Sequence, residues 1–481
     1  MLNPPFVPGF VRCGRWQGTV ARGGELYYPI WLAYATGALE QAGNTVRLID
    51  AIARKWDKSM VLQDVSRFKP GLVVIDSNFS SMSNDANIAI LLKVAIPGIK
   101  TVLVGPPASQ FAERLLRSGG VDIVARMEYD FTLREIAQAI EYGGDFGSIK
   151  GISYISDGRI IHNPDREFIS PEELDDIPFV SRVYKQHLHI EDYFLSQALY
   201  PEVQIFTGRG CPFHCTFCSW PETLMGRGYR GRSVSNVVDE FEYITSGMPE
   251  VREIFIEDDT FTMDKPRIMA ICEEIRKRKL KIVWSCNARA SLDYETMVEM
   301  KSAGCRLLDV GYESGSDEIL KNIRKGVTTE RMRQFARDAR RAGLMVLGDF
   351  VFGFPGETRE TAEKTIAFAR ELKPNIAQFA VSVPIPGTGF HRWAEENNFL
   401  LTEDIEKSVD ANGFQKCIVS YPEFSDRDVE NYVDKALKKY YLSPSYIPVA
   451  MSNIFRENGL HELTGMIKSA RTFLKYLGRK K

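Results

Sequence analysis

The sequence has few cysteines, no long apolar run and almost no net charge. Its eight cysteines are spread over 481 residues, too thinly for the disulfide framework of a small secreted protein. The sequence contains no run of about 18 apolar residues, so no transmembrane helix is predicted. The N-terminus lacks the basic start and apolar segment of a secretory signal. The sequence therefore favours a cytoplasmic protein, in which a tight cysteine cluster indicates metal binding or catalysis.

The charges are nearly balanced, with 61 Lys and Arg against 63 Asp and Glu and a formal net charge of −2. Because no overall basic field is present to hold a nucleic-acid backbone, nucleic acid is not an expected partner. Hydrophobic residues make up 44% and charged residues 26%, as in ordinary globular proteins. A chain of this length exceeds what one hydrophobic core supports, so we expect several domains.

The first 150 residues alternate short apolar runs with stretches of helical periodicity. Strands are predicted at 45–49, 71–75, 101–104 and 121–124, and helices at 29–41, 59–68, 86–94, 112–117 and 129–142. This alternation predicts a doubly wound parallel sheet, whose ligands bind beyond the carboxyl ends of the strands. Segments 76–81 and 105–109 follow two of these strands, and their small and polar residues would let a bulky ligand approach the backbone.

Residues 151–200 lose this rhythm, and we expect them to form a linker with a hairpin that turns at Asp157-Gly158. The alternation resumes over 201–390. Strands are predicted there at 203–207, 253–256, 281–285, 307–311, 345–352 and 376–381. These strand-and-helix units favour a partial (β/α)6 barrel of the TIM kind, with its chemistry at the carboxyl ends of the strands. Residues 391–481 are predicted to be mostly helical, and the chain as a whole is α/β.

Three cysteines follow the first predicted barrel strand on one loop: Cys211, Cys215 and Cys218. The spacing Cys-x3-Cys-x2-Cys lets three thiolates bind three irons of a cubane iron–sulfur cluster, which leaves the fourth iron open. A zinc site is the alternative, but it requires a fourth Cys or His ligand. His214 lies inside the loop, and no Cys-x2-Cys or His-x3-His pair occurs elsewhere. The pattern favours the cluster.

The cysteine loop resembles the signature of radical S-adenosylmethionine enzymes. In that family the amino and carboxylate groups of S-adenosylmethionine chelate the open iron. An electron from the reduced cluster then cleaves the sulfonium to a 5′-deoxyadenosyl radical. The resemblance implies a 4Fe-4S cluster held by Cys211, Cys215 and Cys218, with the backbone of Phe217 near the adenine.

The resemblance also implies roles for the ends of the second and third barrel strands. Glu257, Asp258 and Asp259 stand where the family binds the methionine amino group, although its usual Gly-Gly-Glu is an acidic triplet here. Asn287 and Arg289 belong to the segment WSCNARA, which ends the third strand. Arg289 would pair with the methionine carboxylate, because a guanidinium matches a carboxylate bidentately.

The fourth and fifth barrel strands end in the segments GYESG and GFPGET. In the family the fourth strand end supplies ribose contacts, a role that the resemblance assigns to Glu313 and Ser314. Gly353 and Phe354 begin the next segment, where the glycines would admit the adenine closely.

The front part and the barrel together resemble the branch of the family that carries an N-terminal cobalamin-binding domain. Segments similar to IEDDTF, WSCNARA, GYESG and GFPGET occur in the anaerobic magnesium-protoporphyrin monomethyl ester cyclase and in a hopanoid-biosynthesis enzyme. The resemblance covers roughly residues 1–400 and implies cobalamin as a further cofactor. The signature Asp-x-His-x-x-Gly is absent, because Asn78 stands where its axial His would be. The contacts expected to cobalamin are Asn78, Ser80, Ser81, Gly105, Glu128 and Tyr129.

We therefore expect a radical enzyme that abstracts hydrogen from an unactivated carbon of a lipid, tetrapyrrole or secondary metabolite. With methylcobalamin over the barrel it would be a C-methyltransferase, while relatives also perform cyclisation, hydroxylation and rearrangement. An iron–sulfur and S-adenosylmethionine binding protein without turnover is the alternative of another class. No residue is assigned a catalytic role beyond cofactor binding.

The expected partners are a small-molecule or lipid substrate and a reductase, such as a flavodoxin or ferredoxin, that donates the electron. The basic C-terminal tail, 468–481, would also allow contact with an anionic membrane surface.

Overall fold

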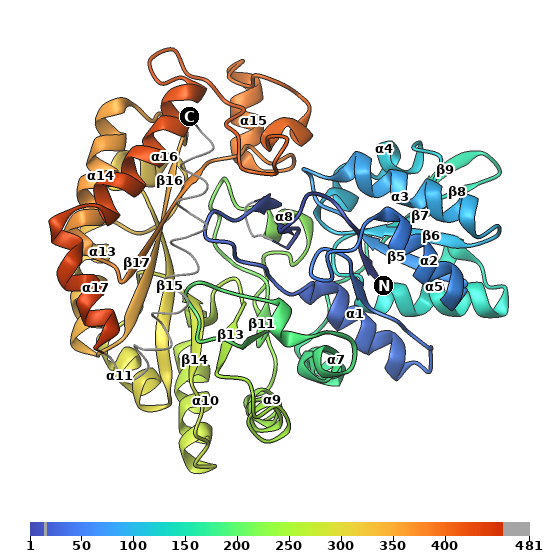
Figure 1. Cartoon of the computed structure of the whole chain (residues 1–481), viewed down its shortest axis with the longest axis horizontal. Helices are drawn as coiled ribbons and strands as arrows, with labels where there is room; N and C mark the ends of the chain where they lie inside the picture. Colours follow the sequence, from blue (N-terminus) through green and yellow to red (C-terminus); the bar gives the residue numbers. More distant parts are fainter. Residues whose placement is uncertain (14–16, 456–481) are drawn as a thin grey trace.

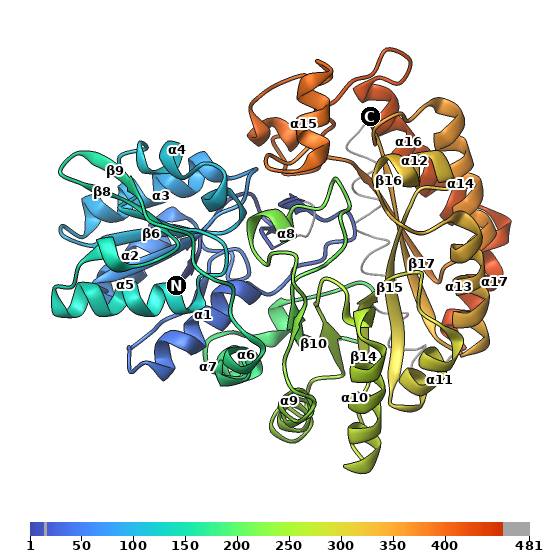
Figure 2. The same ribbon diagram turned by 180° about the vertical axis from the view of Figure 1, so that it is seen from behind.

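The computed structural model describes residues 1–13 and 17–455 of the chain. Two sheet-based halves lie side by side, and the short helix α8 (Trp220–Thr223) lies between them in both views (Figures 1 and 2). In the described residues no helix is long and apolar enough to cross a membrane. The fold is the α/β arrangement that the sequence predicts.

The first sheet has the strand order β4-β1-β5-β6-β7-β8-β9. Its parallel strands are β1 (Leu2–Asn3), β4 (Ile49–Asp50), β5 (Leu72–Asp76), β6 (Lys100–Val104) and β7 (Ile123–Ala125). The strand predicted at 45–49 begins only at Ile49, and β1 was not predicted. Two residues at a chain end give too short a pattern for a period of two to be recognised.

The predicted hairpin is present and enlarges this sheet. Strands β8 (Ile152–Ser156) and β9 (Arg159–His162) pair with each other and, through β8, run antiparallel to β7. Asp157 and Gly158 both have positive φ, as a two-residue hairpin turn requires. The linker then continues through α6 (Pro171–Asp176) and α7 (Val180–His187).

Helix α1 (Ile30–Gln41) joins the two halves through a continuous apolar core. Every residue of α1 from Ile30 to Leu39 is buried, which explains why its sequence is apolar all round instead of amphipathic. Trp31 and Tyr34 pack on Phe206 of the second half, with ring centroids 5.0 and 5.6 Å away. The remaining helices of this half are α2 (Lys58–Phe68), α3 (Met82–Ala95), α4 (Ala112–Leu116) and α5 (Asp130–Tyr142).

The second sheet is an open, wholly parallel partial barrel in the order β10-β13-β14-β15-β16-β17. Its strands are β10 (Glu202–Ile205), β13 (Glu253–Ile256), β14 (Trp284–Ala288), β15 (Cys305–Glu313), β16 (Met345–Phe352) and β17 (Ile376–Val381). All six predicted strands are present, and β14 begins three residues later than predicted. A pair of short strands, β11 (Gly208–Arg209) and β12 (Arg230–Gly231), flanks the cysteine loop.

Helices follow the barrel strands in alternation. They are α9 (Val234–Gly247), α10 (Lys265–Lys277), α11 (Tyr294–Ser302), α12 (Asp317–Asn322), α13 (Thr329–Arg341) and α14 (Arg359–Leu372). The C-terminal part adds α15 (Gly389–Glu396), α16 (Asp426–Tyr441) and α17 (Ile447–Ile454). Residues 397–424, within the region predicted to be mostly helical, contain only one short 3-10 helix, at Ile405–Ser408. Isolated bridges such as Leu400 to Val419 hold this segment as a folded loop.

Candidate functional site

The cysteine loop lies between β11 and α8, at the carboxyl end of the first barrel strand. Gly210 opens it with φ +89°, and a Cβ there would lie 2.0 Å from the carbonyl oxygen of Gly228, so only glycine fits. Cys211, Cys215 and Cys218 are all free thiols; Cys215 is buried and the other two are half-buried. The amide of Cys218 donates to the carbonyl of Cys215, which curls the loop back on itself.

The donor set fits an iron–sulfur cluster better than a single ion. In residues 1–13 and 17–455, no three His, Cys, Asp or Glu side chains converge as a single-ion site, and His214 is exposed. A cubane takes one thiolate per iron, so its three ligands need not meet at one point. Three cysteines on one loop, none of them in a disulfide, meet that requirement.

Three neighbouring side chains act on these thiols. The Thr260 Oγ1 lies 3.8 Å from the Cys211 Sγ. Burial, and then the nearby carboxylate of Asp259, raise the pKa of the Cys211 thiol. On the other side, the Arg289 Nη1 lies 4.0 Å from the Cys215 Sγ and brings a positive charge to the loop.

Arg289 is a buried cation without an anion. Its side chain is 7% exposed, and its guanidinium lies 3.5 Å from the ring centroid of Phe213 and donates to the carbonyl of Lys325. Within the described part of the chain it forms no salt bridge, and its Nε has no hydrogen-bond partner. Since buried charges are normally paired, this guanidinium is available for the carboxylate of a ligand.

Two members of the acidic triplet differ in role: Asp258 supports the fold, whereas Asp259 acts on the cysteine loop. Asp258 is fully buried and accepts hydrogen bonds of 2.6 Å from both the backbone amide and the hydroxyl of Thr207. Burial raises the pKa of Asp258, and Arg267 opposes that shift. Asp258 therefore ties two strand ends together, while Asp259 acts electrostatically on Cys211.

Glu313 and Ser314 occupy a bulge at the end of β15. Glu313 has φ +64°, a conformation that non-glycine residues adopt at a cost. One of its oxygens accepts from the Lys325 Nζ at 2.7 Å, and the other has no hydrogen bond within the described residues. The Ser314 hydroxyl lies 3.2 Å from that of Thr365. Ser314 thus braces the bulge, and Glu313 holds one unused acceptor.

Residues 353–358 form a tight turn built on a buried carboxylate. Glu357 accepts from the backbone amides of Gly353 and Phe354, and burial raises its pKa to about 8. The turn places the ring of Phe354 4.8 Å, centroid to centroid, from that of Phe217 on the cysteine loop. On the third strand, Asn287 donates to the carbonyl of Ile256 at 3.3 Å. Phe217 and Phe354 thus make one apolar wall beside the thiols.

Most residues expected to contact cobalamin make intramolecular bonds. The Asn78 amide accepts from the backbone of Gly18 at 2.9 Å and donates to the carbonyl of Arg12 at 2.7 Å. Ser80 bonds Gln17 and Ser408, and Ser81 donates to Asp85. The Glu128 carboxylate forms ion pairs with Arg209 and Arg230. Asn78, in the place of an axial His, therefore serves as a loop brace.

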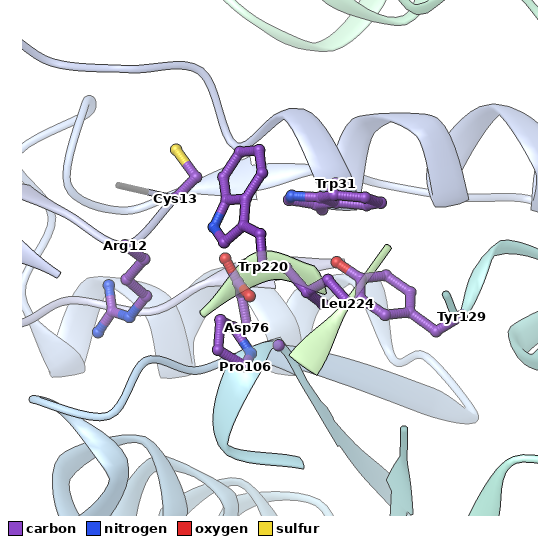
Figure 3. A pocket seen from close by; sticks show the side chains of 9 residues that line it. Arg12, Cys13, Trp31, Asp76, Pro106, Tyr129, Trp220 and Leu224 are labelled. Carbon is purple, nitrogen blue, oxygen red and sulfur yellow. The ribbon is translucent and has the colours of Figure 1, made fainter. Parts of the chain in front are cut away.

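A small cavity of ≈ 10 Å³, room for about one water molecule, lies where this strand edge meets α8. Figure 3 shows the side chains that line it. Its lining residues are Arg12, Cys13, Trp31, Asp76, Gly105, Pro106, Tyr129, Trp220 and Leu224. The Tyr129 hydroxyl and the Trp31 indole N–H are buried there without hydrogen-bond partners in the described residues. Burial raises the pKa of Asp76 to about 7.

Gly105 permits the backbone to pass close to this edge: its φ is +101°, and a Cβ would lie 2.3 Å from the carbonyl oxygen of Ser77. Buried polar atoms without hydrogen-bond partners in the described part of the chain, here the Tyr129 hydroxyl and the Trp31 N–H, lie beside a backbone that carries no side chain at Gly105. Such a surface suits a ligand with a polar rim, such as a corrin. Among the described residues, no histidine lines the cavity. The residues at this edge would contact the polar rim of a corrin through Tyr129 and Trp31.

Sequence reasoning missed several charged groups inside the barrel. Asp309 on β15 and Asp349 on the adjacent β16 share a side-chain hydrogen bond. Burial, and then the neighbouring charge of Asp309, raise the pKa of Asp349 far above its usual range. Lys325 reaches the same region through Glu313. No spacing in the sequence signals these contacts, because they join separate strands and loops.

Two family models match this chain. Residues 205–369 match the radical SAM superfamily, and residues 17–137 match the B12 binding domain. The first match runs from the last residue of β10 into α14 and includes the cysteine loop, and the second covers β4 to β7 of the first sheet.

Individual proteins are similar along most of the chain. An uncharacterised methyltransferase of Pyrococcus horikoshii is 31% identical over 90% of this chain and 91% of its own length. The anaerobic magnesium-protoporphyrin IX monomethyl ester cyclase of Rubrivivax gelatinosus is 26% identical over 74% of this chain and 64% of its own. The radical S-adenosylmethionine methyltransferase TsrM of Kitasatospora setae, solved with cobalamin and a [4Fe-4S] cluster, superposes with a TM-score of 0.70 at 18% identity, covering 88% of each chain.

Proposed function

The chain belongs to the radical S-adenosylmethionine superfamily, and on that premise we propose that it is a cobalamin-dependent radical C-methyltransferase. Cleavage of S-adenosylmethionine at a 4Fe-4S cluster follows from the family. The methyl-transfer step is supported by the P. horikoshii relative, which is named a methyltransferase and matches over nearly its whole length. The observation in the site that carries the proposal is the buried Arg289, which forms no salt bridge in the described residues, beside the three-cysteine loop.

The cluster and S-adenosylmethionine, when bound, supply the 5′-deoxyadenosyl radical, and cobalamin supplies the methyl group. Cys211, Cys215 and Cys218 would hold three irons of the cluster. Arg289 is charged and buried, and it would hold the methionine carboxylate. Asp259 would orient the amino group. Together these side chains would orient S-adenosylmethionine for reductive cleavage.

The aromatic wall of Phe217 and Phe354 would cover the adenine and exclude water from the radical. The unused oxygen of Glu313 is placed to accept from a ribose hydroxyl. Gly353 keeps its positive φ through the Glu357 carboxylate, which binds its amide. Each of these groups holds its position through bonds that the protein itself supplies.

On the facing half, the strand edge around Gly105 would take the corrin. The Tyr129 hydroxyl and the Trp31 N–H are the protein groups there with bonds still to make. The acid pair Asp309–Asp349 would face the substrate inside the barrel, where its carboxyl groups would offer hydrogen-bonding partners. The substrate is a small molecule or lipid, and a flavodoxin- or ferredoxin-type reductase would supply the electron.

The alternative of another class is a protein that binds the cluster and S-adenosylmethionine without turnover. A cluster carrier needs neither a buried guanidinium without an anion nor a second half with orphaned polar atoms at its ligand edge. These features disfavour that reading.

The test is product analysis after anaerobic reconstitution with iron and sulfide, reduction with dithionite and addition of S-adenosylmethionine, with and without cobalamin. We expect 5′-deoxyadenosine from the intact protein and none from the Cys211, Cys215 and Cys218 to Ala variant. S-adenosylhomocysteine that appears only with cobalamin would mark methyl transfer to the cofactor. 5′-Deoxyadenosine without S-adenosylhomocysteine would point to cyclisation or rearrangement. If neither 5′-deoxyadenosine nor S-adenosylhomocysteine forms when candidate substrates are present, the proposal that the protein turns over is refuted.

A further inference from the structure

Helix α17 presents apolar side chains to solvent along one stripe. Ile447, Met451 and Phe455 follow one another at intervals of four residues and are 58%, 50% and 80% exposed. Leu442, just after α16, is 77% exposed. A surface helix normally turns its apolar side to the core, so this helix has the reverse pattern. An exposed apolar row of this kind marks a contact with another surface.

Polar contacts hold the helix in this orientation. The Asn375 side chain donates to the Asn453 Oδ1 at 2.7 Å, and the Asn453 amide donates to the carbonyl of Asn375 at 3.2 Å. The Tyr446 hydroxyl donates to the same carbonyl at 3.2 Å. Figures 1 and 2 both place α17 on the outer side of the barrel, away from the first sheet. The stripe is therefore fixed outward instead of being a frayed end.

Exposed cations lie on the segments next to α17. Lys438 is exposed one turn before Leu442, Lys373 is exposed where α14 ends, and the Arg370 Nη2 bonds the Ser443 hydroxyl at 3.2 Å. In the part of the chain that the structure describes, none of the three forms a salt bridge. The chain that follows, 456–481, contains seven Lys or Arg and two Glu.

We propose that α17 docks this protein on an anionic lipid surface, with Ile447, Met451 and Phe455 among the acyl chains. Apolar side chains flanked by cations are the chemistry that recognises such a surface. A second copy of the chain fits less well, because a two-fold contact would bring the same cations together. The chain end, 456–481, carries a net positive charge in its sequence and is a less suitable occupant for the same reason. The inference stands apart from the reaction and holds for any substrate.

The test is co-sedimentation of the full-length reconstituted protein with vesicles of phosphatidylcholine, alone or mixed with phosphatidylglycerol. We expect binding to the mixed vesicles that weakens as salt rises. The triple variant Ile447→Ser, Met451→Ser and Phe455→Ser should bind at least about tenfold more weakly. The matched control, Met60→Ser with Val94→Ser, changes residues 43% and 76% exposed on the first half and should bind as the parent does.

Equal binding to neutral and anionic vesicles would overturn the proposal, as would a triple variant that binds like the parent. Sedimentation velocity without vesicles tests the alternative that a second copy of the chain covers the stripe. A smaller particle for the triple variant would show that the stripe joins two copies, which also overturns it. Circular dichroism should show the same helix content in all three proteins, because the Asn375–Asn453 anchor is unchanged.

Discussion

Replacing Arg289 by Gln separates a ligand-binding cation from a structural one. The substitution removes a buried positive charge that has no carboxylate partner in the described residues, so it leaves no anion stranded. The losses within the protein are the hydrogen bond to the Lys325 carbonyl and the contact with the Phe213 ring. We expect folding stability to change by no more than about 1–2 kcal/mol, because one net hydrogen bond is worth about 1 kcal/mol.

Binding of S-adenosylmethionine should respond far more. A charge-assisted bond to a carboxylate contributes about 1.5–3 kcal/mol, which corresponds to roughly 10- to 150-fold in affinity. Equilibrium dialysis of the anaerobically reconstituted protein gives the dissociation constant, and thermal unfolding of the same samples gives the stability.

Arg306 provides the matched control, because it is as buried as Arg289, at 7% exposure, but forms a salt bridge with Glu253 at 2.9 Å. Arg306→Gln leaves Glu253 buried without that charge, so it should destabilise the fold by about 3–5 kcal/mol. Affinity of its folded fraction for S-adenosylmethionine should be unchanged. An Arg289→Gln protein that binds S-adenosylmethionine normally, or that unfolds as readily as Arg306→Gln, would refute the assigned role.

Three further changes test the first half. Asp76→Asn should stabilise the fold: raising the carboxyl pKa from 3.8 to about 7 makes folded-state stability fall as pH rises between these values. The gain should therefore grow over that range to at most about 4 kcal/mol above it, and a gain in urea unfolding equal at pH 5 and pH 8 would contradict this. Gly105→Ala should destabilise the fold by about 1–3 kcal/mol more than Gly119→Ala in urea unfolding, because both have positive φ but only Gly105 has an atom within 4 Å of the added Cβ; equal losses would exclude the close approach. Tyr129→Phe should leave stability unchanged and weaken cobalamin binding, measured by absorbance titration, about 3- to 10-fold, and unaltered binding would remove Tyr129 from the site.

The sequence predicted the site best where one short segment carries the whole signal. The cysteine spacing indicated the iron–sulfur chemistry of the family that the chain matches, and residues 353–358, which were expected to admit the adenine, form a tight turn after β16. The strand ends were also predictable, because long apolar runs such as β16 and β17 alternate with strongly periodic helices. Arg289 was singled out from its position after β14, and the structure adds that it lacks an anion.

The contacts that join distant segments were not predictable. Lys325 reaches Glu313 from the loop after α12, and Asp309 meets Asp349 only because β15 and β16 are neighbours. The expected cobalamin contacts show the same limit: Asn78 and Glu128 follow strands as predicted, yet their polar atoms bind Arg12, Gly18, Arg209 and Arg230. A residue's place at a strand end is readable from the sequence, whereas its partner depends on the assembled fold.

The central claim is that Cys211, Cys215 and Cys218 hold a cluster with an iron open to S-adenosylmethionine. Electron paramagnetic resonance of the reduced, reconstituted protein, recorded before and after addition of S-adenosylmethionine, tests this most directly. We expect the signal of a reduced 4Fe-4S cluster that changes when S-adenosylmethionine is added, and no cluster signal from the variant with all three cysteines replaced by Ala. A full cluster signal that S-adenosylmethionine leaves unchanged, or a cluster that persists in the triple variant, would contradict the account.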